Sequence, residues 1–446
     1  MNLVYNIKDK PKLGQVALFA LQQLLAIMAA TIAVPAVVNS VTGSEMTASA
    51  ALFGAGIGSI VYLLFTKSGS PVFLGSSFAF LGPMFTAFGS AVSMAAGYAG
   101  LIIGALIAGL VYVIIAIVVK VSGTKWIDRL MPPVIIGPTV AIIGLSLAGN
   151  AIGDLMTSSV EGGSVYVCLI CGLVTLAVTM LASTYGKKMV KLVPFIIGIL
   201  AGYLCASVFA LIGKSTGNAS LVVINYGALE KLSSVVALPD FTFLKADWSA
   251  VNAAYLLTLF VAYAPVAFVV FAEHLADHKN LSSIVGVNLL EEPGLTRTLL
   301  GDGIGSVIGA FFGGCPNTTY GESIATVAIT RNASTVSIWG AAFACIIFSM
   351  ISPLVAFLET IPSCVMGGVC VALYGCIASS GLKMLQPVDL SKNHNLFVAS
   401  VIFIVGVGGM TVSFGAVEIR TVACALILGI LTNVMLRGEK DEEKDA

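Results

Sequence analysis

Three acidic side chains interrupt long apolar stretches of the sequence, and these residues are the best suited to chemistry. Glu273 stands in VVFAEHLADHKN, Asp302 in LLGDGIG and Glu322 in PNTTYGESIATVAITR. An ionisable group at membrane depth is costly, and it usually marks a substrate site, an ion path or a proton relay. Few basic residues lie nearby, and those few fall at predicted membrane edges. The three carboxyl groups are therefore candidates for binding a ligand and for exchanging a proton.

Two histidines and a further acid surround Glu273. Glu273 and Asp277 are four residues apart, which places them on one helix face. His274 is turned from Glu273 by about 100° on a helix, so no single face collects all four polar groups and no metal site is expected. Asp277 and His278 either couple transport to protons or mark the cytoplasmic end of the helix. Asp302 is either functional or the N-terminal cap of the next span.

Two short polar stretches are expected to break the membrane segments that contain them. They are Phe73–Phe80 (FLGSSFAF) and Asn317–Tyr320 (NTTY). Two such extended stretches can pair and leave half-helices behind them, whose N-termini present free N–H groups to a ligand. Phe78 and Gly321 are the expected backbone donors, although Phe78 is equally well explained as an apolar packing ring. Carboxylates beside such donors suit a planar ligand that has both N–H and C=O groups.

The composition indicates a polytopic membrane protein without a cofactor. The 446 residues are 58% hydrophobic and 10% charged, whereas soluble domains carry about 25% charged residues. A net charge of zero gives no indication of a nucleic-acid partner. No nucleophile–base pair or metal-ligand cluster is visible, so an enzyme is not expected. The CxxC pair Cys168 and Cys171 lies in an apolar run and is interpreted as packing.

Fourteen spans are predicted, and the first apolar run is too long for a signal peptide. The spans fall near residues 14–38, 47–66, 71–90, 95–119, 130–149, 164–184, 189–213, 251–275, 298–313, 316–330, 335–358, 362–382, 395–413 and 419–436. Two of them, 71–90 and 316–330, begin at a proline and are polar at first, so each is a poor span by itself. The first residues of these two spans are similar in sequence and lie 245 residues apart, one in each half of the chain.

The charge distribution supports this count. With the N-terminus in the cytoplasm, all but four of the 22 basic residues fall inside, as the positive-inside rule expects. The four on the outside are Lys214, Lys231, Lys245 and Arg420. Both termini are then cytoplasmic, and the long outside loop at about 214–250 divides the chain into halves of seven spans. An odd number of spans inverts the second half, which is a transporter architecture.

Four strings spread over both halves carry a resemblance to a known family. They are LGSSFAF (74–80), AEH (272–274), PGLTRTLLGDG (293–303) and PNTTYGES followed by AITR (316–331). With these strings the chain resembles the nucleobase–cation symporters of the nucleobase–ascorbate transporter family, and most of all its bacterial uracil carriers. The resemblance implies an all-α polytopic protein of fourteen segments in two inverted repeats of seven, with short strands in segments 3 and 10.

The resemblance also implies a division into domains. Residues 14–119 and 251–358 would form a core domain, and residues 130–213 and 362–436 a gate domain. The two domains would move against each other to give alternating access from either side of the membrane. Homodimerisation through the gate domain is a further implication.

Carried over residue by residue, the family's site falls on residues already singled out. Glu273 and Glu322 would hold a pyrimidine by its edge, and the backbones of Phe78 and Gly321 would complete the site. The implied activity is proton-coupled uptake of uracil through the cytoplasmic membrane, with xanthine, another purine or another nucleobase as the alternative. An anion transporter of the same fold is a more distant alternative. The candidates for proton coupling are Glu322, Glu273, Asp302, Asp277 and His278.

The sequence departs from the family pattern at a few positions near these residues. Ser323 and Ala325 stand where the family usually has Asn and Gly after the acid of the tenth span. Gln23 replaces a common histidine of the first span, and Asp277 replaces a second histidine, which here follows one residue later as His278. Both glutamates of the site are present, so the departures concern the proton relay and the substrate range.

Overall fold

The structure is a computed structural model that describes residues 3–123, 132–187, 189–230, 234–414, 417–419 and 421–436. Lys231, Arg420, the start of the predicted span at 130 and the C-terminal end from residue 437 lie outside these ranges. Within them, eight helices are long and apolar enough to cross a membrane. They span Leu13–Thr42, Ala48–Phe65, Met94–Ser122, Pro133–Leu155, Val165–Tyr185, Pro194–Thr216, Ala253–Val285 and Ser363–Met384.

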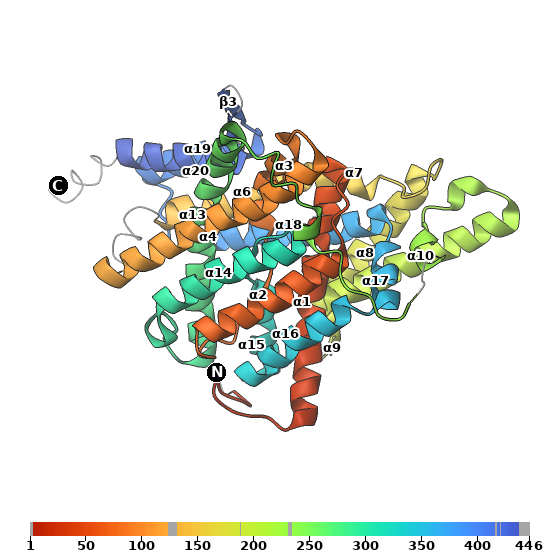
Figure 1. The fold of residues 1–446 in the computed structure, drawn as a ribbon, viewed down its shortest axis with the longest axis horizontal. Helices are drawn as coiled ribbons and strands as arrows, with labels where there is room; N and C mark the ends of the chain where they lie inside the picture. Colours follow the sequence, from red (N-terminus) through yellow and green to blue (C-terminus); the bar gives the residue numbers. More distant parts are fainter. Residues whose placement is uncertain are drawn as a thin grey trace.

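Each of the fourteen predicted spans contains a helix or a half-helix (Figure 1). The first half contains α1 (Leu13–Thr42), α2 (Ala48–Phe65), β1 (Leu74–Ser76), η1 (Phe78–Phe80), α3 (Leu81–Gly89), α4 (Met94–Ser122), α6 (Pro133–Ser146), α7 (Ala148–Leu155), α8 (Val165–Tyr185), α9 (Met189–Leu192) and α10 (Pro194–Thr216). The connection between the halves contains η2 (Ala219–Leu221), α11 (Gly227–Glu230) and α12 (Thr242–Lys245).

The second half follows the same order of elements. It contains α13 (Ala253–Val285), η3 (Leu290–Gly294), α14 (Leu295–Gly313), β2 (Asn317–Thr319), α15 (Gly321–Thr330), α16 (Thr335–Ser349), α17 (Ser352–Glu359), α18 (Ser363–Met384), α19 (Asn393–Val407), β3 (Val412–Phe414), β4 (Val417–Ile419) and α20 (Thr421–Met435). In both halves a three-residue strand precedes a short helix, in the third segment (β1, α3) and in the tenth (β2, α15).

The two short strands pair with each other, as the sequence predicted. β1 and β2 are antiparallel, with Leu74 opposite Thr319, Gly75 opposite Thr318 and Ser76 opposite Asn317. Both strands are fully buried. Backbone groups at membrane depth have no water to bind, so irregular backbone is tolerated only where the protein supplies partners. Each strand supplies the partners that the other needs.

Helix α2 supports both strands from behind. The Ser59 hydroxyl donates to the carbonyl of Leu74 at 3.1 Å and accepts from the Leu74 N–H at 2.9 Å. The amide nitrogen of Asn317 donates to the carbonyl of Gly54 at 3.0 Å. These contacts fix the strands against a membrane-spanning helix, so the strand pair has a defined position.

The helices pack in two groups. In one group, α14 lies against α2 and α4, α16 against α1 and α2, and α13 against α4. In the other, α18 lies against α6 and α8, α8 against α10, and α19 against α20 and α6. The groups meet where α13 and α1 contact α6, α10 and α20. Small residues allow such close contacts in a membrane, since a side chain at Gly54 would overlap the backbone of Gly309.

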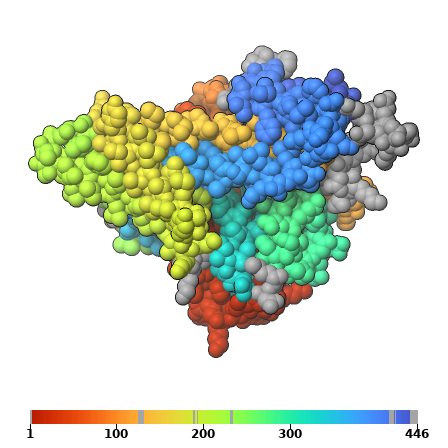
Figure 2. Space-filling view, turned by 180° about the vertical axis from the view of Figure 1, so that it is seen from behind, coloured from red at the N-terminus to blue at the C-terminus, as the bar shows by residue number. Residues whose placement is uncertain are grey.

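The second group reaches farthest from the centre of the molecule. Helices α8 and α10 lie at one end of the ribbon in Figure 1, and the same segment extends from the body in the space-filling view of Figure 2. The exposed side chains of these two helices are mainly apolar, including Leu173, Leu181, Leu204 and Leu211. An apolar outer surface is what a membrane-embedded helix pair requires.

The structure excludes one of the two alternatives left open for Asp277 and His278, and one of the two left open for Asp302. Helix α13 continues to Val285, past the predicted end at residue 275, so Asp277 and His278 do not mark its end. Helix α14 begins at Leu295 after Gly294, so Asp302 lies inside it and is not a cap. His278 and Asp302 are buried, and Asp277 is half-buried, so these residues do not form water-facing helix ends.

Gly75 offers a test of the strand pair. A Cβ atom at this position would overlap the ring of Tyr320, so we expect Gly75→Ala to destabilise the protein by about 1–3 kcal/mol, as overpacked sites do. The measurement is the thermal unfolding midpoint of the protein in detergent. Gly82→Ala is the matched control, because no atom lies within 4 Å of a Cβ there. Equal midpoints for the two variants would contradict the close approach of Tyr320 to β1.

Candidate functional site

A small cavity lies where the two strands end and the two short helices begin. Its volume is about 60 Å³, which is room for more than one water molecule. The four residues predicted to bind a substrate, Glu273, Glu322, Phe78 and Gly321, all line it. The other lining residues are Ser77, Ala79, Ile143, Thr318, Thr319, Tyr320, Leu373 and Ile377. The structure thus brings residues from both halves of the chain to one place.

Two helix N-termini point their first backbone groups toward this cavity. Phe78 is the first residue of η1, which continues into α3, and Gly321 is the first residue of α15. The first N–H groups of a helix have no acceptor within the helix and carry partial positive charge. No other atom lies within 4 Å of a Cβ position at Gly321, so a ligand can approach its backbone closely.

The two glutamates line the same cavity from two different helices. Glu273 comes from the middle of α13, and Glu322 from the first turn of α15. Both are half-buried. Among the residues that the structure describes, no basic side chain forms an ion pair with either of them. Their oxygens are therefore available to accept hydrogen bonds from a ligand.

Asp277 joins α13 to the strand pair. Its Oδ2 accepts a hydrogen bond of 2.7 Å from the hydroxyl of Thr319, the last residue of β2 and a lining residue of the cavity. Asp277 lies one turn beyond Glu273, on the same face of the helix. A change in the protonation of Asp277 would alter its hydrogen bond to Thr319, which is three residues before Glu322 in the sequence.

A different face of α13, turned by about 100° from the acidic one, carries the two histidines, and both are buried. The Nδ1 atom of His274 lies 2.7 Å from Oδ2 of Asp302, and its Nε2 atom lies 3.0 Å from the hydroxyl of Thr298. The ring of His278 stacks on that of His274, with 4.0 Å between centroids. These contacts join α13 to α14, and they place Asp302 away from the cavity.

His278 is also fully enclosed. Its Nδ1–H donates to the carbonyl of His274 at 2.8 Å, which leaves Nε2 to accept from the hydroxyl of Tyr62 at 2.7 Å. Its exposed fraction is 0%. The five candidates for proton coupling therefore fall into two sets. Glu273 and Glu322 line the cavity, and Asp277 contacts its wall. His278 and Asp302 lie instead where α13 packs against α2 and α14.

Two of the departures from the family pattern contact each other. The amide nitrogen of Gln23 donates to the hydroxyl of Ser323, which also accepts from the N–H of Phe73 at 3.0 Å. Helix α1, helix α15 and the chain leading into β1 therefore meet at one buried hydroxyl. Sequence reasoning treated Gln23 and Ser323 separately, although both departures were visible.

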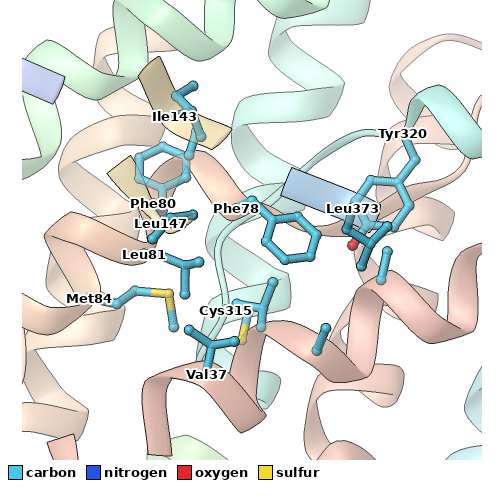
Figure 3. Close-up of a cluster of buried hydrophobic side chains, with 14 of the residues drawn as sticks. Val37, Phe78, Phe80, Leu81, Met84, Ile143, Leu147, Cys315, Tyr320 and Leu373 are labelled. Carbon is cyan, nitrogen blue, oxygen red and sulfur yellow. The ribbon is translucent and has the colours of Figure 1, made fainter. Parts of the chain in front are cut away.

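Sequence reasoning missed the apolar wall of the cavity. Ile143 of α6 and Leu373 and Ile377 of α18 close it from the second group of helices. The ring of Tyr374 meets the ring of Phe78 edge-on, at 5.7 Å between centroids. In Figure 3, Phe78 lies in the middle of an apolar cluster, with Leu373 and Tyr320 on one side. Apolar residues within apolar spans give no signal of this role.

A second cavity of about 160 Å³ adjoins the first and shares Phe78, Ala79 and Ile143 with it. It lies between α3 and α13 on one side and α6 and α20 on the other, and its polar residues include Asn150 and Thr421. Phe78 thus stands between the site and a space that separates the two groups of helices.

The contact between His274 and Asp302 can be measured by a double-mutant cycle. We expect His274→Ala and Asp302→Ala each to lower the unfolding midpoint, because each leaves a buried polar partner unmatched. The double variant should lose less free energy of unfolding than the two single variants lose together. The difference, the coupling energy, should be about 1–3 kcal/mol. Strictly additive losses would show that the two side chains do not interact.

The comparison with protein families finds one match over most of the chain. The Permease family matches residues 14–414. This range includes both strands, both short helices and every residue that lines the cavity.

Curated relatives are similar over almost their whole length. The chain is 38% identical to the uracil permease of Bacillus caldolyticus over 443 residues, which cover 98% of this chain and 95% of the relative. It is 36% identical to the uracil permease of Escherichia coli (strain K12) over 427 residues, with 95% and 92% covered. A more distant relative is the putative pyrimidine permease RutG of the same strain, at 28% identity.

Solved structures share the fold. The transmembrane domain of the cyanobacterial bicarbonate transporter BicA superposes with a TM-score of 0.64 at 16% identity, covering 96% of this chain and 99% of that domain. The murine anion transporter Slc26a9 gives a TM-score of 0.65 at 14% identity, covering 96% of this chain and 69% of that protein. These likenesses concern the fold alone, and they confirm fourteen segments in two inverted repeats of seven.

Proposed function

Because the chain belongs to the Permease family, we propose that it carries uracil across a membrane in symport with protons, by alternating access. The observation that supports this function most directly is the cavity itself. Two carboxylates, Glu273 and Glu322, and two helix N-termini, at Phe78 and Gly321, converge on it. Neither carboxylate has a basic partner among the residues that the structure describes. The uracil permeases to which the chain is similar cover nearly its whole length.

The chemistry of the cavity matches the edge of a pyrimidine. Uracil presents N–H donors and C=O acceptors around a planar ring. Glu273 and Glu322 accept its N–H groups, and the backbone N–H groups of Phe78 and Gly321 donate to its carbonyls. A site built for these hydrogen bonds rejects analogues that lack them, because its own polar groups would then stay unpaired. Ile143 and Leu373 supply apolar contact to the ring.

Three acids are placed to carry the coupled proton. Glu273 and Glu322 touch the substrate, while Asp277 binds Thr319 on the wall. Protonation of Asp277 changes that hydrogen bond and so connects proton uptake with the strand that precedes Gly321. His278 and Asp302 position α13 against its neighbours, as their buried contacts indicate.

The two groups of helices act as core and gate. The core comprises residues 14–119 and 251–358, and the gate comprises residues 130–213 and 362–436. Core residues supply the polar side of the cavity, and gate residues Ile143 and Leu373 supply the apolar side. Movement of the gate past Phe78, into the adjoining 160 Å³ space, would open the site to one side of the membrane at a time.

The chain is a multi-pass membrane protein, and we place it in the cytoplasmic membrane of a bacterial cell. Both termini lie on the cytoplasmic side, as the excess of basic residues in the predicted inside segments supports. The apolar outer surface of α8 and α10 contacts lipid or, in a homodimer, the gate of a second copy. An enzymatic activity is not part of this proposal.

A xanthine or purine carrier is the second candidate, and the glutamate at position 322 counts against it. The fold is similar to that of anion transporters, but the acidic side chains of this cavity do not favour an anion. An anion would face Glu273 and Glu322 at close range, where like charges repel. A neutral nucleobase meets no such penalty.

Uptake of radiolabelled uracil tests the function in cells that lack their own permease. We expect uptake that a protonophore abolishes and that excess xanthine leaves unchanged. Glu322→Gln and Glu273→Gln should each reduce kcat/KM about ten- to hundredfold, the cost of one hydrogen bond to a charged group. Glu161→Gln, an exposed loop residue, is the control. Uptake that xanthine blocks would replace uracil with a purine as the substrate.

Asp277→Asn tests the coupling role. This change keeps a side-chain oxygen for Thr319 but removes the ionisable group. We expect the variant to exchange uracil across the membrane in both directions yet to fail to accumulate it against a gradient. Asp389→Asn, at an exposed loop residue, should accumulate uracil normally. Accumulation by Asp277→Asn with unaltered sensitivity to a protonophore would remove Asp277 from the relay.

A further inference from the structure

A large cavity opens near the N-terminal segment, away from the carboxylates of the transport site. Its volume is about 500 Å³, within the range of pockets that hold small ligands. Three parts of the chain form it: residues 6–8, the turn 66–69 after α2, and residues 285–297 between α13 and α14. Figure 2 shows the N-terminal segment in red bordering the green segment that contains η3 and α14.

The cavity collects positive charge. Lys8, Lys67 and Arg297 line it, against the single carboxylate of Glu292. Lys8 and Glu292 lie 3.4 Å apart with both side chains largely exposed, so their ion pair is weak and easily exchanged. In the described part of the chain, Lys67 and Arg297 form no ion pair. A net excess of cations therefore faces the space.

The walls of the cavity are partly apolar. Ile7, Val285, Val287 and Pro293 line it beside the basic residues. Basic residues on this face are expected from the positive-inside rule alone. That rule requires charge in the loops, however, and it does not account for cations from three distant segments around one space with apolar walls.

Hydrogen bonds hold the N-terminal wall in place. The N–H of Val4 donates to the carbonyl of Arg331 at 2.8 Å, and the N–H groups of Ala333 and Thr335 donate to the carbonyls of Tyr5 and Ile7 at 2.9 and 3.1 Å. The segment before α1 is therefore hydrogen-bonded to the connection between α15 and α16. This wall of the cavity is formed without a ligand.

The wall after α2 is held as firmly. Lys67 and Ser68 adopt left-handed backbone conformations, with φ of 49° and 54°, which cost a non-glycine residue about 1–2 kcal/mol each. The indole N–H of Trp339 donates to the hydroxyl of Ser68 at 3.0 Å and helps to fix the turn. The N–H groups of Lys67 and Ser68 donate to carbonyls in the last turn of α2, and the N–H of Gly69 donates to the carbonyl of Thr66. The charge offered to a ligand therefore comes from side chains.

We propose that this cavity binds an organic phosphate, with the phosphate group held by Arg297, Lys67 and Lys8 and an apolar or ring moiety held by the valines and Pro293. The guanidinium of Arg297 matches the bidentate geometry of phosphate, and the lysines act as point charges. The binding of the phosphate displaces Glu292 from Lys8. A soluble nucleotide and the headgroup of an anionic phospholipid share this chemistry, and the two sources are separated by experiment.

The soluble arm uses the purified full-length protein in a zwitterionic detergent. The probe is uridine 5′-monophosphate, titrated by calorimetry, with uridine as the probe that lacks the phosphate. We expect the monophosphate to bind in a salt-sensitive manner, since ions screen exposed charges. The double variant Lys67→Gln/Arg297→Gln should weaken binding at least about tenfold, as the loss of charged hydrogen bonds does. Binding that persists in Glu322→Gln places the probe outside the transport site.

The lipid arm uses the same variants in nanodiscs of phosphatidylcholine with and without phosphatidylglycerol. If the occupant is a lipid headgroup, phosphatidylglycerol should slow hydrogen exchange in residues 66–69 and 287–297 of the native protein but not of the double variant. Lys120→Gln is the matched control in both arms, because Lys120 is an exposed lysine at the end of α4 outside the cavity.

Dependence on Lys67 and Arg297 in either arm supports the site and identifies its source of phosphate. The proposal is overturned if neither probe depends on these residues, or if Lys120→Gln weakens binding as much as the double variant does. An unchanged thermal unfolding midpoint of the double variant shows that it is folded, so the test does not depend on which substrate is transported.

Discussion

Backbone hydrogen bonding at membrane depth is the constraint on which the rest of the structure depends. The chain interrupts two of its membrane segments, at Leu74–Ser76 and Asn317–Thr319, and the groups freed there find partners in the facing strand and in the Ser59 hydroxyl of α2. Once they are paired, the helices that follow must begin at the same level, so their N-termini meet around one space. The cavity, its backbone donors and the position of Glu322 all follow from that pairing.

Helix α13 carries polar side chains on two different faces. One face turns Glu273 to the cavity and Asp277 to the strand, where a ligand or a proton can reach them. The other turns His274 and His278 into helix contacts with Asp302 and Tyr62. Buried polar groups are stable only when they are matched, so the histidine face holds the helix while the acidic face stays available. A functional face and a structural face thus share a few turns of one helix.

Sequence reasoning identified the broken segments and their pairing because proline, glycine and polar residues within apolar spans are strong local signals. The same local signals singled out Glu273, Glu322, Phe78 and Gly321, and the resemblance to the family implied that these four residues form one site. It gave a wrong helix end where polar residues bind partners that are distant in the sequence. Asp277 and His278 suggested a helix end, yet Thr319 and Tyr62 bind them inside the protein.

Other features left no local signal in the sequence. Leu373 and Ile377 are apolar residues in the apolar helix α18, so nothing in the sequence distinguishes them from apolar residues that do not line the cavity. The contact between Gln23 and Ser323 joins positions that are distant in sequence, and only the fold brings them together. Such pairs depend on tertiary packing, which single-residue patterns do not contain.

The strand pair also has a consequence for the order in which the protein is made. The first seven segments leave the ribosome with Leu74–Ser76 unpaired, and the missing partner is not synthesised until Asn317–Thr319 appears. Until then an exposed strand edge remains within the newly inserted half, a state that invites mispairing with other chains. The first half therefore reaches its final paired state only after the tenth segment is synthesised. The cavity between the two halves is among the last features of the molecule to be completed.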